Sequence, residues 1–136
     1  MSHKRRSTLE KKIQADIEAD LGAEPDLLLL RNAVGKATYV DDEAREFHVP
    51  FGLGVGSPDL VTLLLMPSTP PIAVWFCLEV KAEEGDVDPE QEKCHRIWRR
   101  FGALISVVRS VAEARAALLE ARASLRSLCS TDRSAA

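Results

Sequence analysis

Residues 72–81 read IAVWFCLEVK, an apolar run that ends in a glutamate and a lysine. A run that is apolar on both faces is typical of a central strand covered on each side of a sheet. Because side chains alternate along a strand, Glu79 and Lys81 point to one face and Leu78 and Val80 to the other. Charged side chains are almost never fully buried unless they are paired or bound to a metal. The run therefore predicts a central strand whose charged end has a special role.

A second buried strand is predicted upstream over Asp59–Met66, directly after the residues GSP. Pro67–Pro71 is the predicted turn, and it is short enough to join the two strands as an antiparallel hairpin. In this hairpin Asp59, at the start of one strand, lies near Glu79, at the end of its neighbour. The sequence thus predicts two carboxylates that converge on one point.

Two converging carboxylates favour a hard cation such as Mg²⁺, which takes oxygen ligands and keeps several waters. The ligands would be Asp59, Glu79 and the backbone carbonyl of Val80. Lys81 lies beside this site, where it can orient or deprotonate an attacking water and offset charge in a transition state. The alternative is a hairpin salt bridge from Lys81 to one of the carboxylates, which contributes only about 0–1 kcal/mol if exposed.

The remaining pattern predicts the order helix, strand, strand, strand, helix, strand, helix (αβββαβα). This alternation indicates an α/β fold in which helices flank both faces of a mixed central sheet. Residues 31–48 are predicted to be irregular, with a turn at 41–43, and residues 51–56 to form a glycine-rich loop. The other predicted elements are a helix capped by Ser7 or Thr8 and ended by Gly22, a strand at Leu27–Leu30, a helix from Asp88 to about Phe101, a strand at Leu104–Val108 and a helix from Val111 to about Leu128.

Length and composition indicate one globular domain over residues 1–136, with an ordered core at about 7–128. The net charge of −3 is unevenly distributed, because residues 1–92 hold 9 basic and 18 acidic residues, whereas residues 93–136 hold 9 and 3. A basic last third is compatible with a polyanionic partner or with solvated helix faces. No apolar run is long enough for a membrane span, and no secretory signal follows the basic N-terminus, so a cytoplasmic protein is expected.

Two polar side chains have both a structural and a functional interpretation. Ser7 and Glu10 fit a helix capping box, but Glu10 also lies on the helix face that would turn towards the metal site. Asp88 and Gln91 fit a second capping box, and Gln91 can also lean towards Lys81. The residues alone favour the capping role for Glu10.

Several other residues have plain interpretations. Gly52, Gly54 and Gly56 permit unusual φ angles or a close approach of the backbone to a ligand, but they form no nucleotide-binding motif. His48 and His95 have no partners at metal-ligand spacing and are interpreted as structural or surface residues. The three cysteines are odd in number and lack metal-site spacing, so neither a zinc site nor a disulfide framework is expected. The C-terminal helix carries Arg115, Arg122 and Arg126 on what is predicted to be a solvated face.

These segments together resemble the VRR-NUC family of PD-(D/E)xK nucleases, in its small stand-alone form from phages and bacteria. The matching pieces span residues 9 to about 120 in the family's order. They are Glu10-x-x-Ile13, Arg31-Asn32-x-x-Gly35, Gly54-x-Gly56-Ser57-Pro58-Asp59-Leu60, Leu78-Glu79-Val80-Lys81-Ala82, Pro89-Glu90-Gln91 and Val107-Val108-Arg109-Ser110.

The resemblance implies a restriction-endonuclease-like fold and a Mg²⁺- or Mn²⁺-dependent DNA endonuclease. It implies Asp59, Glu79 and the Val80 carbonyl as metal ligands and Lys81 as the catalytic lysine. For Glu10 and Gln91 it favours a role at the active site over a role as helix caps. It also implies a homodimer that is selective for branched DNA such as Holliday junctions, with the glycine-rich loop or the apolar strand edges at the dimer interface.

The stretch from Ala82 to Asp88 departs from the family pattern, because it is strongly acidic where relatives carry proline, glycine and a basic residue. A phosphate backbone would be repelled there, so the alternative is a nuclease-like DNA-binding or assembly module with little turnover. Candidate DNA contacts are Arg31, Asn32, Lys36, Ser57, Arg96, Arg99 and Arg100.

Overall fold

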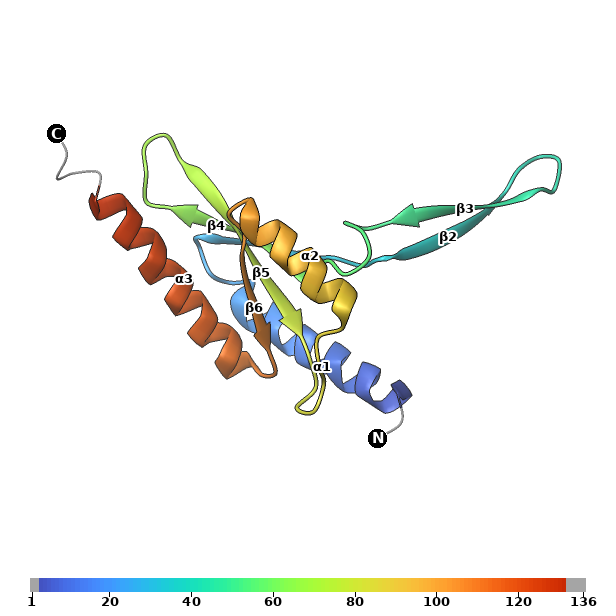
Figure 1. Ribbon diagram of the computed structural model, residues 1–136, viewed down its shortest axis with the longest axis horizontal. Coiled ribbons are helices and arrows are strands. Elements are labelled where there is room, and N and C mark those ends of the chain that lie inside the picture. Colours follow the sequence, from blue (N-terminus) through green and yellow to red (C-terminus); the bar gives the residue numbers. More distant parts are fainter. Residues whose placement is uncertain (1–2, 132–136) are drawn as a thin grey trace.

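The computed structural model describes the backbone of residues 3–131 and the side chains of residues 8–129, so residues 1–2 and 132–136 lie outside it. A sheet stands between helices, and a long hairpin extends away from this body (Figure 1). In chain order the elements are α1 (His3–Leu21), β1 (Leu27–Arg31), β2 (Gly35–Val40), β3 (Glu46–Phe51), β4 (Leu60–Met66), β5 (Ile72–Val80), α2 (Pro89–Arg100), β6 (Leu104–Val108) and α3 (Val111–Thr131).

The main sheet has four strands in the order β1-β4-β5-β6. Strands β1, β4 and β5 are antiparallel neighbours, and β6 runs parallel to β5. The sheet is therefore mixed, and the apolar run that was predicted to be a central strand is central. The predicted hairpin of β4 and β5 is also confirmed, since Leu60 pairs with Leu78.

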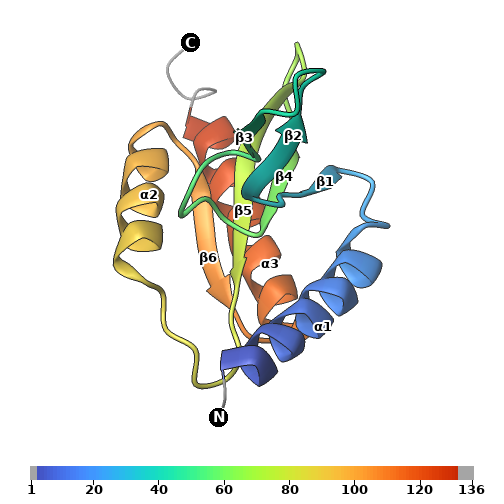
Figure 2. The same cartoon turned by 90° about the vertical axis from the view of Figure 1, so that its right-hand side faces the viewer.

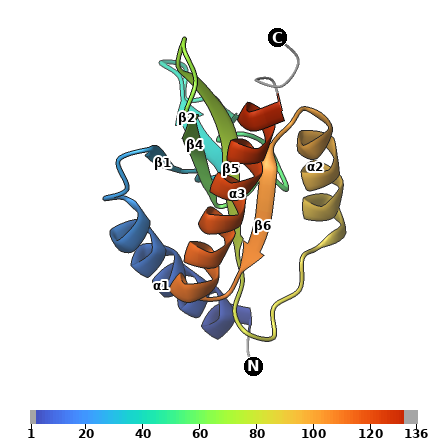
Figure 3. The same ribbon diagram turned by 90° about the vertical axis from the view of Figure 1, so that its left-hand side faces the viewer.

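Alternation along β5 divides the core between the two faces of the sheet. Phe76, Leu78 and Val80 join the larger apolar cluster with residues of α1 and α3, whereas Cys77 packs on the opposite face beside Trp98 of α2. The views from two opposite sides agree, with α1 and α3 on one side of the sheet and α2 on the other (Figures 2 and 3). The predicted α/β architecture with helices on both faces is confirmed. Cys77 is fully buried and free, as a core residue should be.

The prediction that residues 31–48 are irregular is wrong, because most of them form the antiparallel hairpin of β2 and β3. Only the turn at 41–43 lies where it was expected. The six residues of β3 are all exposed, so this hairpin buries almost nothing within its own chain. Phe47, Val49 and Phe51 stand at alternate positions along β3, which is a strand signal that the prediction of an irregular segment overlooked.

Two helix boundaries also differ from the prediction. Helix α1 begins at His3, so Ser7 and Thr8 lie inside the helix and neither is its N-cap. Helix α3 continues to Thr131, beyond the predicted end at about residue 128. Helices α1 and α3 therefore extend beyond residues 7 and 128. None of the three helices in the described part of the chain has the length and apolar content that a bilayer crossing requires.

The arginines of α3 are only partly on a solvated face. Arg122 lies 2.6 Å from both Glu24 and Asp26, and Arg115 lies 2.6 Å from Asp20. Hydrogen bonds from Arg122 hold the pKa values of Glu24 and Asp26 below their usual range. These ion pairs fasten the segment between α1 and β1 onto α3, so the solvated-face prediction is wrong for Arg122 and holds for the exposed Arg126.

Candidate active site

Two carboxylates meet where β4 begins and β5 ends. Asp59 directly precedes β4, and its Oδ2 accepts a hydrogen bond of 2.8 Å from the backbone N–H of Val80. Glu79 is only 1% exposed and lies on the face of β5 that α2 covers. The convergence predicted from strand pairing is therefore present, because antiparallel register places Asp59 opposite Glu79.

Glu79 is surrounded by polar side chains although it lies in the interior. Its Oε1 is 3.1 Å from Lys81 Nζ and accepts a hydrogen bond from Gln91 Nε2. Its Oε2 lies 3.4 Å from His95 Nε2, and neither of these two atoms has a hydrogen-bond partner within the described residues. The salt bridge that the sequence left as an alternative is thus formed, but one lysine faces two carboxylates.

Burial and charge repulsion disturb both carboxylates. Burial, followed by the repulsion of Asp59, raises the pKa of Glu79 to about 7, against the attraction of Lys81. Burial also raises the pKa of Asp59, although its bond from Val80 acts in the opposite direction. Burial lowers the pKa of His95, so its ring adds no charge that would balance them. Lys81 is the cation that acts against both shifts, and carboxylates with pKa values shifted in this way are frequent at active sites.

Gln91 has both of the roles that the sequence allowed. The backbone N–H of Gln91 donates to Asp88 Oδ1 at 2.9 Å, and Gln91 Oε1 accepts from the Asp88 N–H, which completes the capping box of α2. The same Oε1 accepts from Lys81 Nζ at 2.8 Å. The cap therefore fixes the first turn of α2 and also holds Lys81 against Glu79.

Glu10 does not cap α1, because the helix begins seven residues earlier. Its Oε1 accepts instead from the backbone N–H of Ala82 at 3.2 Å, directly after Lys81. Its charge contributes to the raised pKa of Asp59. The preference for a capping role is wrong, and the functional interpretation places Glu10 correctly at the edge of the site.

Asn32, the residue that follows β1, holds the loop before Asp59 in place. Asn32 Nδ2 donates to Ser57 Oγ at 2.7 Å and to the Pro58 carbonyl at 2.8 Å. Gly56 has φ +82°, and a Cβ there would lie 2.5 Å from the Glu90 carbonyl. The predicted unusual φ angles are confirmed, but the close backbone approach at Gly56 is to α2.

The other candidate DNA contacts are distributed over several elements. Arg31 forms two hydrogen bonds of 2.9 Å with Glu18, and Lys36 is exposed on the hairpin. Arg96, Arg99 and Arg100 are exposed on α2, and Arg99 donates to the Ile105 carbonyl at 2.9 Å. Contact of these residues with DNA stays a prediction.

Sequence reasoning missed two residues of the site. His95 is 2% exposed and faces Glu79, whereas the sequence predicted a structural or surface residue without partners at metal-ligand spacing. Its spacing of four from Gln91 was the available signal, since residues i and i+4 share one helix face. Arg109 donates to the carbonyls of Glu83 at 3.2 Å and Gly85 at 3.0 Å, and so fastens the acidic loop that follows Lys81.

The residues present fit a hard divalent cation with few protein ligands. No group of three or more His, Cys, Asp and Glu side chains in the described part of the chain is arranged to hold a metal by itself. Mg²⁺ needs only one or two carboxylates and keeps water as its other ligands. Asp59 and Glu79 supply that number, and Glu79 Oε2 is a buried oxygen without a hydrogen-bond partner among the described residues.

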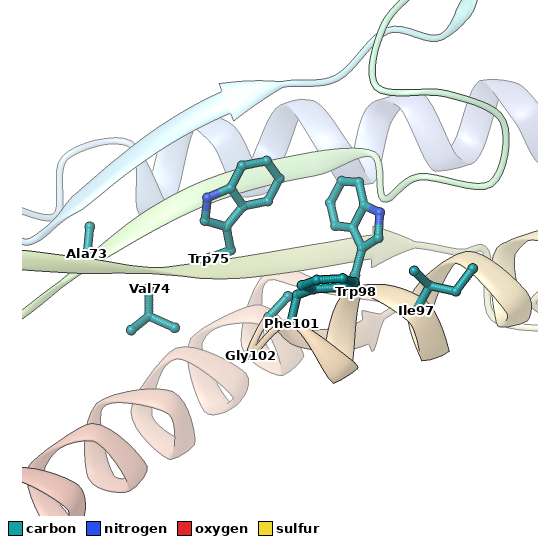
Figure 4. Close-up of a pocket in the computed structure, with 8 residues that line it drawn as sticks. Ala73, Val74, Trp75, Ile97, Trp98, Phe101 and Gly102 are labelled. Carbon is teal, nitrogen blue, oxygen red and sulfur yellow. The ribbon is translucent and has the colours of Figure 1, made fainter.

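An apolar hollow lies on the same face of the sheet but at the other end of α2. It has a volume of about 640 Å³ and is lined by Trp75 of β5, by Ile97 and Trp98 of α2 and by Phe101, the C-cap of that helix (Figure 4). The two indole rings make an edge-to-face contact with centroids 5.2 Å apart. No charged side chain lines this hollow, so it is not part of the carboxylate site.

Comparisons of the chain with protein-family models, with curated proteins and with solved structures found no match.

Proposed function

We propose that this protein is a divalent-metal-dependent DNA endonuclease with a restriction-endonuclease-like fold of the VRR-NUC kind. The observation that carries the proposal is the pair of the half-buried Asp59 and the buried Glu79, with Lys81 beside them at the end of a central strand. The motif order along the chain supports the same activity. Mg²⁺ or Mn²⁺ is the proposed cofactor, held by Asp59, Glu79, the Val80 carbonyl and water, with Glu10 at the edge.

In the proposed reaction a water attacks a DNA phosphate and the bond to the leaving 3′-oxygen breaks, which gives a 5′-phosphate and a 3′-hydroxyl. The bound cation would supply Lewis-acid stabilisation of the charge that develops on the phosphate. Lys81, held by Gln91 at 2.8 Å, would orient the attacking water and offset negative charge. The Val80 N–H holds Asp59 Oδ2, so the other oxygen of this carboxylate is the proposed ligand atom.

The proposed substrate is branched DNA such as a four-way junction. The loop after Lys81 carries Glu83, Glu84 and Asp86, whose charge repels a phosphate backbone that crosses it. DNA strands that diverge at a branch can avoid this loop more easily than the backbones of a continuous duplex.

The direct test is a cleavage assay on single-stranded, duplex, flap and four-way DNA with Mg²⁺, with Mn²⁺ and with a chelator. We expect metal-dependent cutting, fastest on the four-way DNA, and on the order of a thousandfold less with Asp59→Asn. Asp16→Asn, an exposed carboxylate of α1, is the matched control and should cut like the wild type.

Tight binding of four-way DNA without cleavage in either metal would support the nuclease-like binding or assembly module instead. Equal cutting by the wild type and Asp59→Asn would show that the cleavage reaction does not take place at this carboxylate site.

We also propose that the protein is a homodimer in which the β2–β3 hairpin is the interacting arm. Apolar side chains line it, among them Tyr39, Val40, Phe47, Val49 and Phe51, each between 41% and 61% exposed. The hairpin forms its own two-stranded sheet and points away from the body (Figure 1). An isolated two-stranded hairpin is marginally stable in water, so these side chains require a covering surface.

A second copy offers that surface in the hollow between Trp75 and α2. This hollow is apolar, and the adjoining part of α2, residues 93–100, carries four basic and no acidic residues. The hairpin tip, residues 41–46, carries four acidic residues and one arginine. Each copy thus has both halves of a complementary pair, which is what a twofold interface requires. In this arrangement the arginines of α2 face the partner's tip.

The dimer predicts a mass of twice the 15.0 kDa chain in sedimentation or light scattering at micromolar concentration. Phe101, 86% exposed at the hollow, is the residue to change, and Phe101→Glu should shift the mass to that of one chain. Leu119→Glu is the matched control, since Leu119 is 61% exposed on α3 and away from both surfaces.

A wild-type mass of 15.0 kDa would contradict the dimer. A dimer that survives Phe101→Glu as well as Leu119→Glu would exclude the hollow as its interface. Loss of DNA binding in Arg96→Glu or Arg100→Glu without a change of mass would show that these arginines contact DNA and not the partner's hairpin tip.

A further inference from the structure

Two buried polar atoms face each other behind the carboxylate site. Glu79 Oε2 and His95 Nε2 are 3.4 Å apart, in residues that are 1% and 2% exposed. Neither atom has a hydrogen-bond partner in the part of the chain that the structure describes. A buried polar atom without a partner is unfavourable, and an apolar side chain at position 95 would avoid that cost. The histidine therefore has a use that core packing does not explain.

Helix α2 presents two side chains to the two oxygens of Glu79. Gln91 and His95 are four residues apart on one helix face, and they approach Oε1 and Oε2 respectively. Lys81 adds a second contact to Oε1, whereas His95 is the ion-pair partner that approaches Oε2. The capping box at Asp88 fixes the first turn of the helix and so the position of both side chains.

We propose that His95 is a positioning residue that donates its Nε2–H to Glu79 Oε2 and fixes the carboxylate in the orientation that binds the cation. This inference rests on the proposed metal site and names a further residue of it. When Glu79 is ionised against a cation, the contact becomes a charge-assisted hydrogen bond, which is shorter and stronger than a neutral one. His95 acts through Glu79 and has no contact of its own with the reacting atoms.

The test measures Mn²⁺ binding to the full chain by titration calorimetry, without DNA and without an activity readout. We expect Mn²⁺ affinity to fall about 10- to 100-fold in His95→Leu, as it does when a partner of a ligating carboxylate is removed. His95→Gln keeps an N–H donor of similar reach, and its affinity should stay within about threefold of the wild type. Asp59→Asn should abolish the binding, which locates the titrated site.

The thermal midpoint of each variant without metal separates positioning from folding. His95→Leu should be at least as stable as the wild type, because it replaces an unpaired buried polar atom by an apolar group. Unchanged Mn²⁺ affinity in His95→Leu overturns the inference while the proposed nuclease stands. Equal losses in the Leu and Gln variants also overturn it, since the donor would then not matter. Absence of Mn²⁺ binding in the wild type overturns both.

Discussion

Glu79→Gln is expected to abolish metal-dependent DNA cleavage while leaving the fold at least as stable as the wild type. The amide keeps the shape of the side chain and can still accept from Gln91, but it cannot supply an anionic ligand. Cleavage should fall on the order of a thousandfold. Stability should rise by about 1–3 kcal/mol without metal, because burial and Asp59 disfavour the ionised carboxylate more than Lys81 favours it.

Two measurements check this result. Calorimetric unfolding without metal gives the stability change, and the shift of the midpoint on adding Mn²⁺ gives binding. The wild type should gain about 2.7 kcal/mol at a Mn²⁺ concentration of about a hundred times the dissociation constant, and Glu79→Gln should gain none. Glu120→Gln, on the exposed face of α3, is the matched control and should behave like the wild type. A Glu79→Gln protein that still cuts DNA would contradict the proposed ligand set.

Lys81→Met is expected to abolish cleavage and to keep the metal. Lys81 is a hydrogen-bond partner of Gln91 and an ion-pair partner of Glu79, and the proposed ligands do not include it. Removing a positioned proton-transfer or charge-stabilising group costs about a hundredfold to ten-thousandfold in rate. Mn²⁺ affinity should not fall below that of the wild type, because the two carboxylates lose their one positively charged neighbour and the cation replaces it.

Glu79→Gln and Lys81→Met together separate metal binding from the cleavage reaction. Single-turnover cleavage of the best DNA substrate gives the rate, and titration with Mn²⁺ gives the affinity. Lys12→Met, an exposed lysine of α1 that pairs with Asp16, is the matched control. If Lys81→Met lost cleavage only in proportion to a loss of Mn²⁺, the lysine would serve the metal site and not the reaction.

The parts of the fold that bury apolar surface were predictable from the sequence. Continuous apolar residues predicted the strand at 72–81 and the strand upstream of it. The short turn between them sets their register. Residues 31–48 gave no such signal, because the hairpin they form is exposed throughout β3 and its stability depends on contacts outside its own sheet. The start of α1 was misplaced because a plausible capping residue lay inside the helix.

The sequence by itself determined that Asp59, Glu79 and Lys81 lie together, because strand alternation and one hairpin are local rules with a period of two. Only the tertiary structure decided what surrounds them. Glu10 reaches the site from α1 and His95 from α2, since helix packing sets those distances and sequence spacing does not. The same holds for the exposed β2–β3 hairpin and the apolar hollow beside Trp75, because their exposure depends on how the elements pack.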